Sequence, residues 1–529
     1  YYNQHSYQIS DQMSGNTFVK MPDGSVKHNL MEGPFAFIGH NSGISGDLGL
    51  NWQINENHSL GMKMNYGGML FGNQDIVFED NVYANDELID IVHSTSHTTT
   101  PSSHTFTGNI YYDGNINKLH VNFNADFSDS GYKKETNVNE NSQNDPAFIE
   151  NLSDGVARMG AGKLVLSYPI WKGMFKIGTE ETYVSAKQEY NSTKTEIPSS
   201  KAKIAENNIS GFAEYALPFK YVQVVAGIRY EHVNFEYTNE CSPKDNISRT
   251  HNNWFPSFNA STKIGPVGIN LGYTTKIKRP RYDQLSTELQ YNNRFLYQTG
   301  DPTLLNEIQN TLSLNANWRW LTLTGAYEVV DNAIYQLGYP YDDDCTAMVK
   351  YSNAKETVRK LNIYLNASPT VGIWNPRYTV GMEKQYFETT VIDPRESTGT
   401  RVVKRNDPMF FVQANNSFKL KQGWLIDLDY QYTSPFDYVM YKFTKPKHGL
   451  NLAISKSFLK HDALNVRLAW NDILNKTKEH VCTDYGNFIH NQNNDYYSPS
   501  IQLRLSYRFN TANSKYKGTG AGADAKSRM

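Results

Sequence analysis

The sequence predicts an all-β protein: a transmembrane antiparallel β-barrel with short turns at one end and long loops at the other. Three observations predict it. Apolar residues alternate with polar ones over about twenty segments. The connections between these segments are short and long in strict alternation. Tyr and Trp gather near the segment ends, as at the two interfaces of a membrane barrel.

The alternation is clear in "SIQLRLSYRFN" (500–510), where Ile501, Leu503 and Leu505 share one face of a strand and Gln502 and Arg504 share the other. The expected strands are, in order, 4–10, 45–54, 59–68, 103–113, 118–130, 157–168, 174–189, 205–216, 220–238, 252–263, 267–281, 306–317, 321–337, 356–367, 378–389, 408–420, 424–433, 447–458, 463–472 and 499–509.

Bulk composition excludes a helical membrane protein. The 529 residues are 39% hydrophobic, and no stretch approaches the roughly 18 consecutive apolar residues that a spanning helix needs. A barrel needs only alternate residues to be apolar. The net charge of −2 gives no basis for a nucleic acid partner.

The order of the connections separates a membrane barrel from a soluble sandwich. Short turns occur at 55–58, 113–118, 217–219, 265–266 and 421–423. The connections between them run from about 13 residues (239–251, 434–446) to about 34 residues (11–44, 69–102). A half-buried strand of a soluble sheet explains any one segment, but it does not explain this sorting. In outer-membrane barrels the short turns face the periplasm and the long loops face outside.

Twenty strands form an even-numbered barrel. Barrels of 22 strands have a plugged lumen, and the chain opens in the middle of the pattern at "YYNQHSYQIS". We therefore expect a 22-stranded parent whose first hairpin is missing or misread here. The expected barrel domain covers 1–509, and 510–529 is expected to be a flexible, polar periplasmic tail because it is rich in Gly and Lys.

Two stretches resemble the TonB-dependent outer-membrane receptors. "TTKIKRPRYDQLS" (274–286) is similar to their basic-Arg-Pro-x-aromatic segment, and "TGDPTLLNE" (299–307) is similar to their Gly-Asn-Pro-x-Leu-x-Pro-Glu motif. Asp301 replaces the usual Asn, and Asn306 stands where a second Pro is usual. The matching positions are Arg279, Pro280, Tyr282, Gly300, Pro302, Leu304 and Glu307.

Two further matches lie near the C-terminus. "LAWNDILNKTK" (468–478) resembles the family's Asp-x-aromatic-Asn turn through Asp472 and Asn475, with Leu474 in the aromatic position. Phe509 resembles the terminal Phe that the outer-membrane assembly machinery reads, although 20 residues follow it here.

The resemblance implies a multi-pass barrel in the outer membrane of a Gram-negative bacterium, surrounded by outer-membrane lipid. It implies a receptor that binds a ligand at its extracellular loops and imports it with energy delivered by TonB. The family's N-terminal plug, which TonB contacts, is not in this chain. The candidate ligand-facing loop residues are Tyr339, Tyr341, Asp342, Asp343 and Asp344. The alternative is a barrel that scaffolds a surface lipoprotein or a larger envelope complex.

No catalytic set, resident cofactor or metal site is expected, and the chain is not expected to be an enzyme. His93, His97 and His104 fall in a polar loop that collects His without function more often than it binds metal. The acidic run 342–344 is more often a solvated loop than a Ca²⁺ site. "GTGAG" (518–522) lacks the strand and helix that a nucleotide loop needs. Cys241, Cys345 and Cys482 all lie in expected loops, and their pairing is left open.

Overall fold

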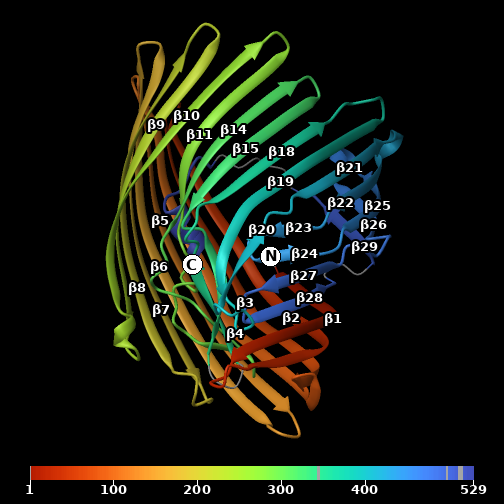
Figure 1. Cartoon of the computed structure of the whole chain (residues 1–529). Helices are drawn as coiled ribbons and strands as arrows, with labels where there is room; N and C mark the ends of the chain where they lie inside the picture. The colour runs from red at the N-terminus through yellow and green to blue at the C-terminus, as the bar shows by residue number, and fades with distance from the viewer. Residues whose placement is uncertain (1, 342–345, 496–498, 510–515) are drawn as a thin grey trace.

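The computed structural model describes residues 2–341, 346–495, 499–509 and 516–529. Tilted antiparallel strands wrap around a lumen that contains folded segments of the chain (Figure 1). The main sheet has 25 strands, of which β20, β23, β24, β27 and β28 belong to the loops and the remaining 20 form the wall. The predicted all-β barrel with about 20 visible strands is thus confirmed.

The wall strands follow one another in chain order, each antiparallel to the next. They are β1 (Tyr2–Lys20), β2 (Val26–Asn55), β3 (His58–Ala84), β4 (Glu87–Ile116), β5 (Leu119–Asn141), β6 (Ala147–Ile170), β7 (Gly173–Ser192), β8 (Ser200–Pro218), β9 (Val222–Asn239), β10 (Ile247–Ile264), β11 (Val267–Lys278), β14 (Glu307–Trp318), β15 (Leu321–Asp331), β18 (Val358–Ala367), β19 (Trp374–Ile392), β21 (Met409–Lys419), β22 (Trp424–Thr433), β25 (Lys447–Phe458), β26 (Leu464–Asn471) and β29 (Ser500–Tyr507).

The two ends of this series do not pair with each other within the described residues. β29 pairs with β26, whereas β1 pairs with β2 along its length and with β28 over Met13–Thr17. A 22-stranded parent stays a prediction.

The prediction of long loops at 11–44 and 69–102 is wrong, because these residues continue the strands. β1 and β2 pair as far as Lys20↔Val26, and β3 and β4 pair as far as Ala84↔Glu87. These ribbons, red to orange in Figure 1, are rich in Ser, Thr, Asn and His. Strand segments that project beyond the membrane meet water on their outer face, so they need no apolar stripe there. Their missing alternation made them look like loops.

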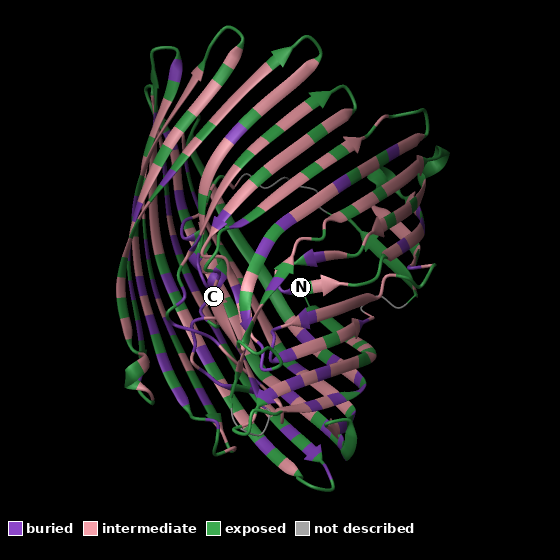
Figure 2. Ribbon diagram, viewed as in Figure 1, coloured by how far each residue is buried: buried purple, intermediate pink, exposed green. Residues whose placement is uncertain are grey.

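Within the membrane the alternation has the expected direction. Leu48, Leu50 and Trp52 are exposed on the outer surface of β2, where they meet lipid. On β5 the opposite faces hold Phe127, which is exposed, and Asn124, which is buried in the lumen. Exposed residues alternate with more buried ones along many of the wall strands in Figure 2.

The loops of the outer end fold into the mouth of the barrel. A second sheet contains β12 (Gln290–Asn293), β13 (Leu296–Thr299), β16 (Ile334–Pro340) and β17 (Ala347–Asn353). Beside it lie β20 (Thr400–Arg405), β23 (Phe436–Tyr438), β24 (Tyr441–Phe443), β27 (Glu479–Asp484) and β28 (Phe488–Asn494), and the short 3-10 turns are η1 (Pro243–Asp245), η2 (Lys421–Gly423) and η3 (Lys460–Asp462). A shared cluster that includes Tyr335, Val349, Phe387, Val403 and Phe488 joins these loops to the wall.

The C-terminal segment also differs from expectation. Residues 516–529 lie against the inner wall and end in α1 (Ala523–Arg528), which is visible inside the barrel in Figure 1. The prediction of a flexible periplasmic tail is therefore wrong for these residues, because their polar groups form hydrogen bonds and ion pairs with the lumenal wall. None of the helices in the described ranges is both long and apolar enough to cross a membrane.

The lipid-facing side of the barrel predicts that a charged substitution there lowers the free energy of unfolding, most strongly near the middle of the bilayer. Leu314 of β14 lies beside Leu271 and Gly325 and is exposed on the lipid side. Leu314→Arg is expected to destabilise the barrel by about 2–4 kcal/mol, as a buried charge does near the bilayer centre. Urea unfolding in lipid vesicles measures this cost. The matched lumenal variant Ser313→Arg is expected to cost much less, and equal costs would contradict the assigned faces.

Candidate functional site: the outer cavities and the lumenal wall

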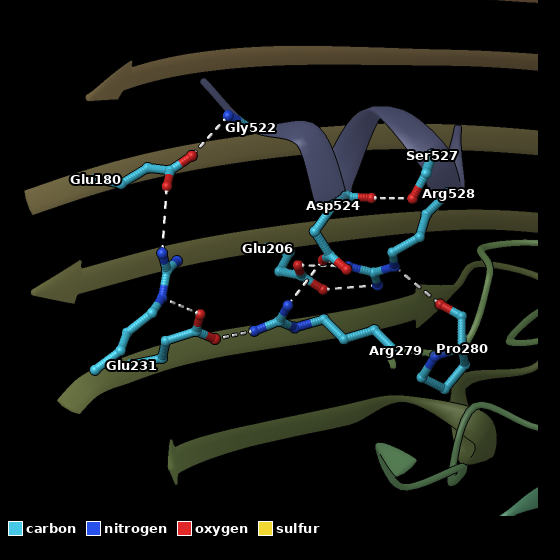
Figure 3. Close-up of polar contacts among 10 residues, drawn as sticks. Glu180, Glu206, Glu231, Arg279, Pro280, Gly522, Asp524, Ser527 and Arg528 are labelled. Atoms are coloured by element: carbon cyan, nitrogen blue, oxygen red, sulfur yellow. Dashed lines mark hydrogen bonds and ion pairs between the residues drawn. The ribbon is translucent and has the colours of Figure 1, made fainter. Parts of the chain in front are cut away.

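The first motif residues lie where β11 leaves the wall. The Arg279 side chain is only 3% exposed and makes ion pairs with Glu231 of β9 and, at 2.8 Å, with Asp524 of α1. The Pro280 carbonyl accepts a hydrogen bond from Arg528 Nε at 2.9 Å. Figure 3 shows these groups meeting on the inner wall. Tyr282 is buried, with its ring 4.5 Å from the Arg528 guanidinium.

The second motif closes the same loop. The N–H of Gly300 donates to Ser286 O at 3.0 Å, and the N–H of Asp301 donates to Gln284 O at 2.7 Å. The residues matched at 299–307 therefore pair with the residues that follow the Arg-Pro motif. A Cβ at Gly300 would lie 2.3 Å from Gln284 O, so only glycine fits this close backbone approach.

Other motif residues connect the loop to its surroundings. Glu307 is buried at the start of β14 and accepts the N–H of Ile334 at 2.7 Å, which fixes the next loop. Asp301, which replaces the family's Asn, makes an ion pair with Lys350 of β17 at 3.0 Å. Pro302 is buried beside it. These residues hold the loops in place.

The matched positions near the C-terminus lie just beyond the ends of β26 and β29. Asp472 and Asn475 form the turn after β26, with the N–H of Asn475 donating to Asp472 O at 2.9 Å and Thr477 donating to the Asp472 carboxylate at 2.7 Å. Both have positive φ, 46° and 49°. Phe509 follows β29 and is 77% exposed on the outer surface.

A cavity of about 540 Å³ lies between this loop and the outer ends of β3–β7. Its lining combines tyrosine rings with amide and hydroxyl side chains, and its charged groups are Lys134, Asp283 and Glu288. Its other lining residues are Gln74, Ile76, Phe78, Ser96, Thr98, Tyr132, Thr136, Asn151, Ser153, Gln188, Tyr190, Ser286, Gln290, Tyr291, Asn292, Gln298, Thr299, Gly300 and Tyr351. Burial raises the pKa of Glu288 to about 7, so this carboxyl is able both to donate and to accept near neutral pH.

A second cavity, of about 570 Å³, lies on the other side of the β12–β13 hairpin. Asn292 and Gln298 border both cavities. Tyr438, Tyr441, Phe443, Tyr485 and Phe488 supply its aromatic surface. Together the cavities offer flat apolar faces and neutral hydrogen-bonding groups at the outer end of the barrel.

The hairpin between the cavities is attached to the wall by ionic contacts. Arg294 contacts Asp90 of β4 at 3.4 Å and Glu140 of β5 at 3.2 Å, and both carboxylates are nearly fully buried. Tyr291 Oη donates to Glu140 at 2.8 Å. A movement of the hairpin would therefore have to separate buried charges.

Two of the predicted ligand-facing residues, Tyr339 and Tyr341, lie away from these cavities. Tyr339 of β16 contacts Ser352, and Tyr341 contacts the carbonyl of Glu196. Neither residue lines either of the two cavities just described. Asp342, Asp343 and Asp344 lie outside the described residues. The cavity residues lacked a sequence signal, because Gln, Asn and Tyr are frequent throughout the chain.

His93, His97 and His104 lie on strand β4, not in the expected loop, and do not converge on one site. His97 contacts Asp75 at 2.5 Å and His104 contacts Asp129 at 2.9 Å, on different strand pairs. Across the described part of the chain, no three His, Cys, Asp or Glu side chains are arranged to hold a metal ion. Cys241 and Cys482 are unpaired there, and Cys345 lies outside it.

A row of lumenal carboxylates also went unnoticed in the sequence. Glu180, Glu206 and Glu231 lie on the neighbouring strands β7, β8 and β9; the first two contact the C-terminal segment, and Glu231 contacts Arg279, which pairs with that segment (Figure 3). The sequence indicated them only weakly. Each carboxylate occupies a position that faces the lumen in the alternating pattern of its strand, and a charged side chain facing water there does not by itself indicate a partner.

The close packing at Gly300 predicts a local effect of substitution. Gly300→Ala is expected to force the chain at 284–286 away, and to raise hydrogen exchange of the 284–301 backbone by about tenfold or more. Gly325→Ala is the control, since its added Cβ meets nothing within 4 Å. If both variants exchange like the parent, the paired-motif geometry is wrong.

Comparisons with known proteins agree with this architecture. The copper transporter OprC superposes with a TM-score of 0.58 at 11% identity, over 90% of this chain and 77% of that chain. The FrpB iron transporter (F3-3 variant) from Neisseria meningitidis gives 0.51 at 11% identity, over 92% and 81%. The Serratia marcescens hemophore receptor HasR, as a double mutant in complex with its hemophore HasA and heme, gives 0.51 at 11% identity, over 95% and 81%.

These structures share the fold with this chain. No curated protein sequence matches it. The model of one family, described as "Outer membrane protein beta-barrel family", matches residues 114–507, which is most of the barrel. The chain therefore belongs to the outer membrane protein β-barrel family, and its place is the outer membrane of a Gram-negative cell.

Proposed function

We propose that this barrel is a receptor that binds a ligand at its outer end and imports it with energy coupled through TonB. The observation that carries the proposal is the folded outer mouth. Strands β12, β13, β16 and β17 form their own sheet inside the mouth of the barrel, and cavities lie beside this sheet. A passive pore needs no such structure, whereas a receptor that holds its ligand before import does.

The ligand-contacting surface is proposed to be the two cavities on either side of the β12–β13 hairpin. Their volumes, about 540 and 570 Å³, are in the range of small-molecule sites. The pairing of aromatic rings with amide groups suits a ligand with flat faces and many neutral hydrogen-bonding groups. The similar structures include proteins named as copper and iron transporters and as a hemophore receptor, which supports import as the activity.

Import requires energy, because ligands at the cell surface are dilute and the hairpin is attached to the wall by buried charges. TonB is the proposed source, acting through an N-terminal plug region that is not part of this sequence. Ligand entry would release the hairpin, and the plug would open the path below it.

A scaffold role is the second candidate, and one surface favours it. Leu88, Ile89 and Ile91 are exposed at the tip of the β3–β4 ribbon, and Phe148 is 62% exposed at the outer end of β6. Apolar side chains in this projecting region have no lipid around them, so they suit contact with a protein such as a surface lipoprotein.

A comparison of deletion strains separates the two functions. Strains lacking this gene or the TonB gene are grown in the same medium, and the solutes left in the medium are compared by mass spectrometry. Import predicts that at least one solute remains in both strains and is depleted by the parent. The scaffold predicts no such solute and a lipoprotein that copurifies in stoichiometric amount, which Ile91→Asp would remove.

A further inference from the structure

We infer that the inner wall from β4 to β9 is a peptide-binding groove and that residues 516–529 of the same chain are its ligand. The segment runs along the lumenal side of these strands and ends beside the loop that begins at Arg279. It faces the lumen and not the lipid, and its wall contacts at Asn124, Asp126 and Glu206 are distinct from the lining of the outer cavities.

The wall recognises the backbone of the segment. The N–H groups of four successive residues, 519 to 522, donate to side-chain oxygens of the wall. Thr519 and Gly520 donate to Asn124 at 3.0 Å each. Ala521 donates to Asp126 at 3.0 Å, and Gly522 donates to Glu180 at 2.8 Å. A segment held in this way is fixed in register along β5 and β7.

The glycines of "GTGAG" follow from this geometry. Gly520 and Gly522 have φ of 74° and 64°, in the left-handed region that favours glycine. A Cβ at Gly522 would also lie 2.7 Å from Met159 Sδ and 2.9 Å from Ala161 Cβ. A nucleotide motif was rejected for this stretch on sequence context, and its glycines instead allow close approach to the barrel wall.

Charge pairing fixes the end of the segment. Arg528 and Glu206 form a bidentate ion pair, with N–O distances of 2.7 and 2.9 Å, and both side chains are nearly fully buried. Arg279, just after β11, pairs with Asp524 of the segment, and Lys526 of the segment pairs with Asp126 of β5. Figure 3 shows the pairs Arg528–Glu206 and Arg279–Asp524. Ion pairs therefore run in both directions between the segment and the barrel, each contributing cations and anions. The low dielectric around Glu206 raises the free-energy cost of leaving this carboxylate unpaired.

Apolar contacts complete the groove. Ala525 is 4% exposed and belongs to the cluster formed by Met159, Val184, Ile204 and Tyr282. Ala523, two residues earlier, is exposed to the lumen. α1 has only six residues, and a helix this short is not stable alone in water. Its folding therefore depends on docking, so the segment is ordered when bound and not when released.

Docking also acts on the outer loop. Arg528 holds the Pro280 carbonyl and covers the Tyr282 ring, and Asp283, Ser286 and Gly300 of the same loop line the outer cavity. Any change in the loop that weakens these contacts weakens docking, and release of the segment loosens the loop by the same free energy. The groove is thus a second binding site whose occupancy is coupled to the first.

Two alanines in the segment allow a matched test in the full protein in its native outer membrane. Ala525→Cys and Ala523→Cys are made separately in a background in which the three native cysteines are serine. Maleimide labelling is expected to be at least about tenfold slower at 525 than at 523, because opening must precede reaction at the buried position. Glu206→Gln or Arg528→Ala should raise the rate at 525 towards that at 523.

Ser527→Ala is the control, because Ser527 is exposed and, among the described residues, its hydroxyl donates only to Asp524 O within the helix. It should leave both labelling rates unchanged. Equal rates at 523 and 525 in the parent would overturn the proposal, as would a rise with Ser527→Ala equal to that with Arg528→Ala. Hydrogen exchange of the unsubstituted chain is the second measurement: the 519–522 amides should be protected, and fast exchange there would overturn docking.

Discussion

The interior of the barrel depends on one network of ion pairs. It joins Arg279, Glu231, Asp524, Arg528 and Glu206. Each of these side chains is buried or nearly so, apart from the half-exposed Asp524. A buried charge is tolerated only with a partner. Charge pairing between the wall and the C-terminal segment completes pairing within each of them: Arg528 pairs with Asp524 of its own helix and with Glu206 of the wall, and Arg279 pairs with Glu231 and with Asp524. The lumen is therefore a structured polar interface and not a water-filled channel along this face.

The same requirement organises the outer end. Arg294 is held by Asp90 and Glu140, while Arg401 bridges Asp393 and Asp484 at 2.8 Å each. Although burial opposes ionisation of Asp393, hydrogen bonds from Arg395 and Arg401 lower its pKa to about 2. Loops of this kind are ordered by paired charges around an apolar cluster, which leaves cavities of defined shape between them.

Sequence reasoning predicted the parts of the fold that lipid imposes. At 267–273 the bilayer demands an apolar residue at every second position, so the pattern predicts β11 directly. Where strands leave the membrane, as at 11–20 and 73–84, that demand ends and the strands could not be separated from loops. The Arg-Pro motif was found by resemblance, but its partners could not be: Arg528 and Glu206 are 322 positions apart. The cavity residues were missed because polar aromatic composition is shared by the whole chain.

Electron cryo-microscopy of the protein extracted from its native outer membrane tests the charge-paired lumen most directly. The account predicts continuous density for residues 516–529 along the inner face of β4–β9, with the Arg528 side chain against Glu206. A lumenal wall covered by a different segment, or left to solvent at Glu206 and Glu231, would contradict it.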